Sequence, residues 1–183
     1  MFAIVQDGII MLLVQAGTAF TWNGVEYPAN WCNLSSPADK AAIGMVDVVY
    51  GTQANDQYYW VTQQDPVYNA QTNQVDINFT STPKDLTSVK GSSINQINST
   101  AYSILLPTDW MVVKAVETST PISPVWNSWR QSIRTTAASA VSGVEGATNV
   151  DEVAAVMSNI NWPKDPDQVA VEAAQVAEAD NGN

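Results

Sequence analysis

Two tryptophans and two arginines share one stretch of predicted helix, and they form the densest group of side chains suited to binding. Trp126 and Trp129 are three positions apart, so they lie side by side on a helix. Arg130 and Arg134 form the neighbouring ridge. Aromatic and arginine side chains that lie together anchor many protein interfaces. In the alternative interpretation, the tryptophans fill the core of their own helical unit, and Arg130 or Arg134 pairs with Asp109. The sequence leaves both interpretations open.

The absence of histidine removes the commonest catalytic and metal-binding arrangements. Ser-His and Cys-His pairs cannot form, and no side chain titrates near pH 7 unless its pKa is strongly perturbed. Cys32 is the only cysteine, so neither a disulfide nor a cysteine metal cluster is expected. A carboxylate pair for glycoside hydrolysis remains open among the 18 acidic residues, but none stands in a recognisable motif. We therefore expect no catalytic residue, no cofactor and no metal site.

The charge balance argues against two classes of partner. Eighteen acidic and seven basic residues leave a net charge of −11. Nucleic-acid binding needs a basic stripe, and anionic membranes attract basic surfaces, so neither partner is expected. The apolar run at residues 9–14 is far too short to span a bilayer, and no basic leader precedes it. These features predict a soluble protein made in a cytoplasm.

Aromatic residues in the first part of the chain offer two further candidate contacts. Tyr58, Tyr59 and Trp60 are consecutive, so they cannot all face one side of a strand, and at least one must point outward or into a partner. Trp31 ends an aromatic-proline segment that begins at Tyr27. A core position is favoured for Trp31, and stacking on a sugar is the alternative.

The first part of the chain is predicted to form short strands and tight turns. Asp7-Gly8 and Asn23-Gly24 each lie between apolar runs, and both favour the backbone of a two-residue hairpin. Ser36 and Asp39 predict a capped short helix with Pro37 in its first turn, and Gly44 ends it. Strands are expected at 2–5, 9–14, 20–22, 25–27, 45–50, 58–61 and 75–79.

From residue 82 onward the apolar spacing becomes helical. Thr82-Pro83 predicts the cap and first turn of a helix that Pro107 ends, followed by a corner and a short linker. A second helix is expected from Ser123-Pro124 to about residue 141, with Gly143 or Gly146 ending it. Thr148 is expected to cap a third helix through residue 157. The prediction is an α+β protein in which a small antiparallel β-rich unit precedes a helical unit. Its parts are a β-rich hairpin domain at 1–81, a helical module at 82–163 and an acidic tail at 164–183, which forms a solvated helix or a mobile tail.

The order of motifs in this chain resembles a known family. Its second half contains, in order, Thr108-Asp109-Trp110, Pro121, Trp126, Trp129-Arg130, Ile133-Arg134 and Trp162-Pro163. Its first half contains the Tyr27 to Trp31 segment, Ser36-Pro37 through Gly44, and Tyr58-Tyr59-Trp60. Together these resemble the small bacteriophage tail proteins known as tail-fibre assembly factors or tail assembly chaperones. The resemblance covers most of residues 1–163, and the acidic Ala/Val-rich tail after Pro166 departs from the family pattern.

The resemblance implies a non-enzymatic phage protein that acts on, or forms part of, the tail-fibre or baseplate apparatus. The first hypothesis is a structural or adaptor subunit of the virion tail, made in the bacterial host cytoplasm. The second is a transient tail-fibre assembly chaperone that the virion does not retain, and a distant third is a receptor- or glycan-binding tip protein or an enzyme. The expected partners are tail-fibre or baseplate proteins, and a homo-oligomer is also compatible. The predicted interface comprises Trp31, Tyr58, Tyr59, Trp60, Asp109, Trp110, Trp126, Trp129, Arg130 and Arg134.

Overall fold

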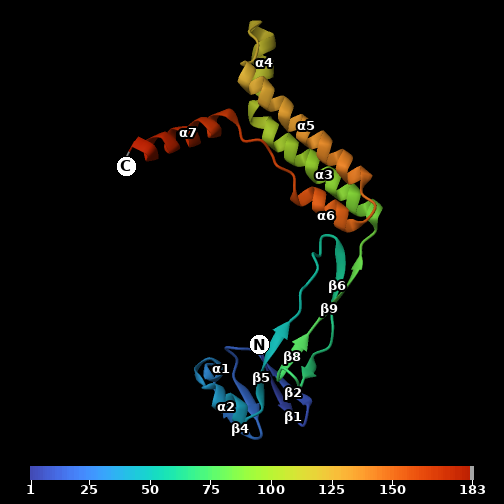
Figure 1. The fold of residues 1–183 in the computed structure, drawn as a ribbon, viewed down its shortest axis with the longest axis vertical. Helices are drawn as coiled ribbons and strands as arrows, with labels where there is room; N and C mark the ends of the chain where they lie inside the picture. Colours follow the sequence, from blue (N-terminus) through green and yellow to red (C-terminus); the bar gives the residue numbers. More distant parts are fainter. Residues whose placement is uncertain (182–183) are drawn as a thin grey trace. The chain divides into compact units, whose positions relative to one another are not determined.

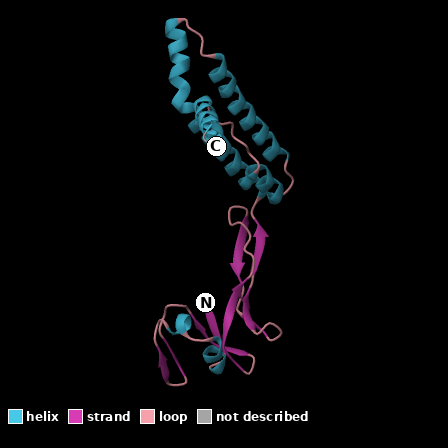
Figure 2. Ribbon diagram, turned by 60° about the vertical axis from the view of Figure 1, so that its left-hand side comes forward, coloured by secondary structure: helices cyan, strands magenta, loops and turns pink. Residues whose placement is uncertain are grey.

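A computed structural model describes the backbone of residues 1–181 and the side chains of residues 1–176. The chain divides into two compact units, Met1–Thr82 and Pro83–Asn183. The first contains most of the strands and the second is helical (Figure 1; Figure 2). The predicted α+β class, with a small β-rich unit before a helical one, is confirmed.

A five-stranded sheet forms the centre of the first unit. Its order is β2-β1-β5-β8-β7, and the strands pair antiparallel except for the parallel pair β5–β8. The two edge strands, β2 and β7, come close to each other, so the sheet is strongly curled. The strands are β1 (Phe2–Gln6), β2 (Ile9–Val14), β5 (Met45–Tyr50), β7 (Val67–Asn69) and β8 (Gln74–Ile77).

Both predicted hairpins are present. Asp7 and Gly8 connect β1 to β2, and Asn23 and Gly24 connect β3 (Phe20–Trp22) to β4 (Val25–Tyr27). All four turn residues have positive φ angles, as the turns that match the twist of a hairpin require. The register of β1 with β2 shifts between Ile4 and Val5, which marks a bulge.

Two apolar clusters occupy opposite faces of the sheet, because successive side chains of a strand point to opposite sides. Ala3 belongs to the cluster that contains Val75 and Ile77. Its neighbour Ile4 belongs to the cluster that contains Cys32. The second cluster extends to partly buried residues of the β3–β4 hairpin and to Trp31.

Two short helices connect the β3–β4 hairpin to β5. The helix α1 (Trp31–Leu34), which was not predicted, is a single turn. The helix α2 (Pro37–Ala42) has the predicted capping box, in which Ser36 and Asp39 bond each other's backbone. The hydrogen bonds from Ser36 lower the pKa of the Asp39 carboxyl. Gly44 follows with φ +71°, and a Cβ there would lie 2.5 Å from the Val5 carbonyl oxygen, so only glycine fits.

The strand predicted at 75–79 is two strands. β8 ends at Ile77, and β9 (Phe79–Pro83) begins after Asn78 and pairs with β6 (Tyr59–Gln63) in a separate two-stranded sheet. Thr82 and Pro83 therefore belong to a strand, and the prediction that they start a helix is wrong. The helix begins three residues later, where Asp85 accepts a hydrogen bond from the Ser88 N–H at 2.8 Å.

Three helices form the core of the second unit: α3 (Leu86–Leu105), α5 (Pro124–Gly146) and α6 (Val150–Ser158). α3 and α5 lie side by side (Figure 1), and the Lys90 ammonium donates to the Glu145 carbonyl oxygen at 2.8 Å. That bond joins the start of α3 to the end of α5, so the two helices are antiparallel. The core residues are Val89, Ser93, Ile97, Ala101, Trp129, Ile133, Ala137, Ala140, Val144, Val150 and Val153.

The helix predicted after Ser123-Pro124 is confirmed, and it continues to Gly146. Of the two glycines predicted to end it, Gly146 is its last residue and Gly143 lies inside it. An added Cβ at Gly143 would approach the Val156 methyl groups at 3.2 and 3.3 Å. The residue is therefore a close-approach point between α5 and α6. The cap of α6 is Asn149 and not Thr148 as predicted.

The predicted corner and linker after residue 106 is mostly helix. A 3-10 turn, η1 (Leu106–Thr108), leads directly into α4 (Asp109–Thr118). Pro107 lies in the first turn of η1, where its missing N–H costs nothing. Within the part of the 164–183 tail that the structure describes, α7 (Pro166–Asn181) is a helix.

Candidate functional site

The junction between α3, η1 and α4 is held by one buried arginine. The guanidinium of Arg130 donates to the Leu105 carbonyl at 3.1 Å, to the Thr108 hydroxyl, and to Asp109 Oδ1 at 2.6 Å. Only 4% of the Arg130 side chain is exposed, against 48% for Asp109. The sequence allowed either Arg130 or Arg134 to pair with Asp109, and in the structure the pair forms with Arg130. Arg130 satisfies the end of α3 and ties α5 to the start of α4.

The neighbouring side chains of α5 differ in exposure. Trp129 is buried, and its indole Nε1 donates to the Pro163 carbonyl at 3.1 Å. Trp126 is half-buried and packs edge-on against Trp129, with ring centroids 5.4 Å apart. Arg134 is exposed, and its Nη1 lies 3.5 Å from the Arg130 carbonyl oxygen. The predicted aromatic and arginine patch is therefore not one exposed surface, because Trp129 and Arg130 are buried and Arg134 is exposed.

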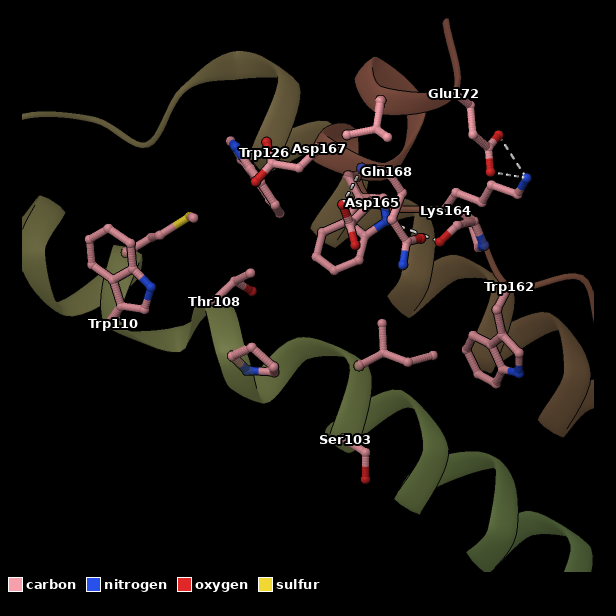
Figure 3. Close-up of a pocket in the computed structure, with 16 residues that line it drawn as sticks. Ser103, Thr108, Trp110, Trp126, Trp162, Lys164, Asp165, Asp167, Gln168 and Glu172 are labelled. Carbon is pink, nitrogen blue, oxygen red and sulfur yellow. Dashed lines mark hydrogen bonds and ion pairs between the residues drawn. The ribbon is translucent and has the colours of Figure 1, made fainter. Parts of the chain in front are cut away.

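The helical unit contains an open groove with a volume of about 1060 Å³. We call it the tryptophan groove, because four of the seven tryptophans of the chain line it. Trp110 and Trp162 lie at opposite ends of the groove in Figure 3. The aliphatic part of the lining includes Ile104 and Pro107. The four tryptophans are Trp110, Trp126, Trp129 and Trp162.

Charged side chains from the start of α7 and the segment before it form one rim of the groove (Figure 3). The Lys164 ammonium contacts both oxygens of Glu172, at 2.7 and 2.8 Å, so these two charges offset each other. Asp165 accepts a hydrogen bond from the Gln168 N–H at 2.8 Å, and Asp167 also lines the groove. The rim is therefore acidic on balance.

The helix α4 has an apolar surface on two sides. Val112, Val113 and Val116 are exposed and lie on one side of the helix. Trp110 lies on another side, 56% exposed, and faces the tryptophan groove. The Lys114 ammonium lies 5.7 Å from the centroid of the Trp110 ring, a cation–π contact.

In the first unit the predicted aromatic residues are separated by burial. Tyr58 is buried, which raises the pKa of its phenol. Tyr59 is half-buried, and Trp60 is the residue that points outward, with 67% of its surface exposed. Trp31 is half-buried and packs edge-on against Phe20 and Tyr27, in contact with the apolar core.

The structure brings together Trp110, Trp126 and Trp129 of the predicted interface, and it adds residues that sequence reasoning missed. Trp162 and the acidic rim belong to the same groove. Trp162-Pro163 was noticed as a motif, but its distance along the chain from Trp126 hid their proximity. A single sequence carries no local signal for this contact, because it depends on how the segment after α6 returns to α5.

Within residues 1–181, none of the helices combines the length and apolar character needed to cross a bilayer. Among the side chains of residues 1–176, no three acidic or cysteine groups gather in a way that could hold a metal ion. Comparisons with protein-family models, with curated proteins and with solved structures each found no match for this chain.

Proposed function

We propose that this chain is a non-enzymatic structural or adaptor subunit of a bacteriophage tail. It binds a tail-fibre or baseplate protein through the tryptophan groove of its helical unit. The location proposed is the tail of the virion, and the partners are proteins rather than nucleic acid or membrane.

The observation that carries this proposal is the convergence of four tryptophans on one open groove. Tryptophan is enriched among the residues that dominate the energy of protein interfaces. A tryptophan needed only for the core would be buried, whereas 56% of Trp110 is exposed. Exposed indole surface beside further aromatic rings favours a partner that covers it.

The motifs that carry the family resemblance support the same role. Asp109-Trp110, Trp126, Trp129-Arg130 and Trp162-Pro163 lie far apart in the chain, yet all of them line the groove or hold its wall in place. Arg130 is buried and donates to three internal partners, so it acts as a support rather than a contact. These motifs of the second half therefore support a binding role for the groove.

Co-purification with tail proteins tests the binding role. The groove variant is Trp110→Ala, and the matched control is Tyr102→Ala, which removes an exposed aromatic side chain of the same unit that does not line the groove. Loss of a tryptophan that anchors an interface weakens binding by about 2 kcal/mol or more, which is about 30-fold. Tagged wild-type protein and the control should retain fibre or baseplate protein from an infected-cell lysate, and the groove variant should lose it. Equal retention by all three contradicts the proposal.

Mass spectrometry of purified virions separates an adaptor from a transient chaperone. A retained subunit is present in each particle at a copy number that matches a tail symmetry. Absence from the particle, together with fibre protein that fails to assemble when the gene is deleted, supports the assembly chaperone instead.

A further inference from the structure

The tryptophan groove joins indole rings to an acidic rim, and this combination selects for one kind of ligand. Aromatic faces attract cations through the quadrupole of the ring, and carboxylates attract them by charge. The rim contains Asp165, Asp167 and Glu172, with Lys164 as its cation. Since Lys164 is paired with Glu172, Asp165 and Asp167 supply the net charge.

The chain itself already shows a cation against this aromatic surface. The Lys114 ammonium lies 5.7 Å from the centre of the Trp110 ring. The indole of Trp110, which lines the groove, therefore accepts a cation within this protein. The net charge of −11 on the whole chain adds a long-range attraction for positively charged partners.

We propose that the groove binds a cationic, apolar segment of the partner protein, whose arginine or lysine side chains lie against the indoles and the acidic rim. This inference rests on the proposed binding role of the groove. Arginine fits best, because its planar guanidinium stacks on aromatic rings and bonds carboxylates through two N–H groups. Apolar side chains of the same segment occupy the surface around Ile104 and Pro107.

Titration of the full-length protein with short peptides tests the charge preference. The probe is an acetylated and amidated pentapeptide of three leucines and two arginines. One control peptide replaces both arginines with glutamate, and a neutral sugar, maltohexaose, represents a glycan ligand. Binding is followed through the indole N–H resonances of ¹⁵N-labelled protein, with the resonances of Trp110 and Trp162 assigned by substitution. The arginine peptide should shift these two resonances and leave that of Trp60 unmoved. Equal shifts with the glutamate peptide, or with maltohexaose alone, overturn the proposal.

Charge variants of the groove test where the attraction arises. Asp165→Asn combined with Asp167→Asn should weaken binding of the arginine peptide about 10-fold at low salt, and less at high salt. Asparagine keeps the hydrogen bond that Asp165 accepts at the start of α7. The control, Glu26→Gln with Asp47→Asn, changes the net charge equally at two exposed residues of the first unit. An equal loss in this control shows that only the overall charge matters, which overturns the proposal.

Removing the positive charge of Lys114 should strengthen binding of the arginine peptide, whereas removing the acidic charges weakens it. Lys114→Met removes the cation that competes for the Trp110 ring and makes the local surface more acidic. It should tighten binding of the arginine peptide about 2- to 5-fold, an effect on the scale of one exposed charge contact. Unchanged or weaker binding counts against the assignment of Trp110 to the cation site.

These results are distinguishable from a failure of the proposed function, because the titration contains no tail protein. If the arginine peptide binds in the groove but no tail protein co-purifies, the tail assignment fails and the groove chemistry stands. If Trp110→Ala abolishes tail-protein binding but the arginine peptide does not bind, only the cationic partner is refuted.

Discussion

Replacing Arg130 with methionine is expected to destabilise the helical unit by about 3 kcal/mol. Breaking a fully buried ion pair costs about 3–5 kcal/mol, whereas an exposed pair contributes about 0–1 kcal/mol. The Asp109 side chain is 48% exposed, so we assign about 2 kcal/mol to the ion pair, between these limits. The Leu105 carbonyl and the Thr108 hydroxyl also lose their donor, which adds about 1 kcal/mol.

The assay is urea unfolding of the full chain, followed by the helical circular-dichroism signal, which arises mainly from the second unit. In a separate thermal unfolding experiment, a loss of about 3 kcal/mol in a unit of this size corresponds to a fall in Tm of roughly 12–24 °C. The matched control is Arg134→Met, which removes an exposed arginine one turn further along the same helix. Its effect should stay within about 0.5 kcal/mol.

The comparison refutes the reasoning if Arg130→Met costs less than about 1 kcal/mol. A well-packed apolar side chain would then replace the ion pair without loss, as happens in some buried ion pairs. A third variant, Asp109→Asn, keeps an acceptor for the guanidinium but removes the negative charge. Its cost should be smaller than that of Arg130→Met, because Leu105 and Thr108 keep their donor.

Two further predictions concern the helices. Gly143→Ala should destabilise relative to Gly91→Ala by about 1–2 kcal/mol, because the first Cβ meets the Val156 methyl groups at 3.2 and 3.3 Å and the second meets open space. Urea unfolding of both variants measures this difference, and equal stabilities would show that α5 and α6 separate without cost. Hydrogen bonds from Ser88 lower the pKa of the Asp85 carboxyl in the folded protein. The charged carboxylate therefore stabilises the start of α3 at any pH above its unfolded pKa of about 4. This stabilisation is lost as the pH falls through the lower pKa of the folded state. Asp85→Asn keeps a hydrogen-bond acceptor but lacks the negative charge at every pH. Its Tm should therefore lie below that of the wild type at pH 7 and approach it as the pH falls. A difference in Tm that does not shrink between pH 7 and pH 3 contradicts this assignment.

The sequence by itself determined the local features of this protein. The hairpin turns at Asp7-Gly8 and Asn23-Gly24, and the capping box of Ser36 with Asp39, depend on contacts between residues a few positions apart. Such contacts are encoded by residue type and spacing, so they could be predicted. The succession of a β-rich and a helical unit followed from the change in apolar period near residue 82.

Prediction failed where local signals competed. Thr82-Pro83 has the pattern of a helix start, but pairing of β9 with β6 extends the strand through both residues. The helix α4 was missed because β-branched valines weaken its helical signal and Pro107 suggested a break. In the structure, Pro107 lies in a first turn, and the Arg130–Asp109 pair holds the start of the helix.

Only the tertiary structure decided which residues form the candidate site. Trp110, Trp126 and Trp162 come from separate segments, and their proximity depends on the antiparallel packing of α3 and α5 and on the return of the chain at Pro163. The same packing buries Arg130 and leaves Arg134 exposed, although the two arginines share a helix and a spacing that made them equivalent in the sequence. Whether a side chain is buried depends on contacts with residues that are far away in the chain. The residue types and spacing of a short segment do not reveal those contacts.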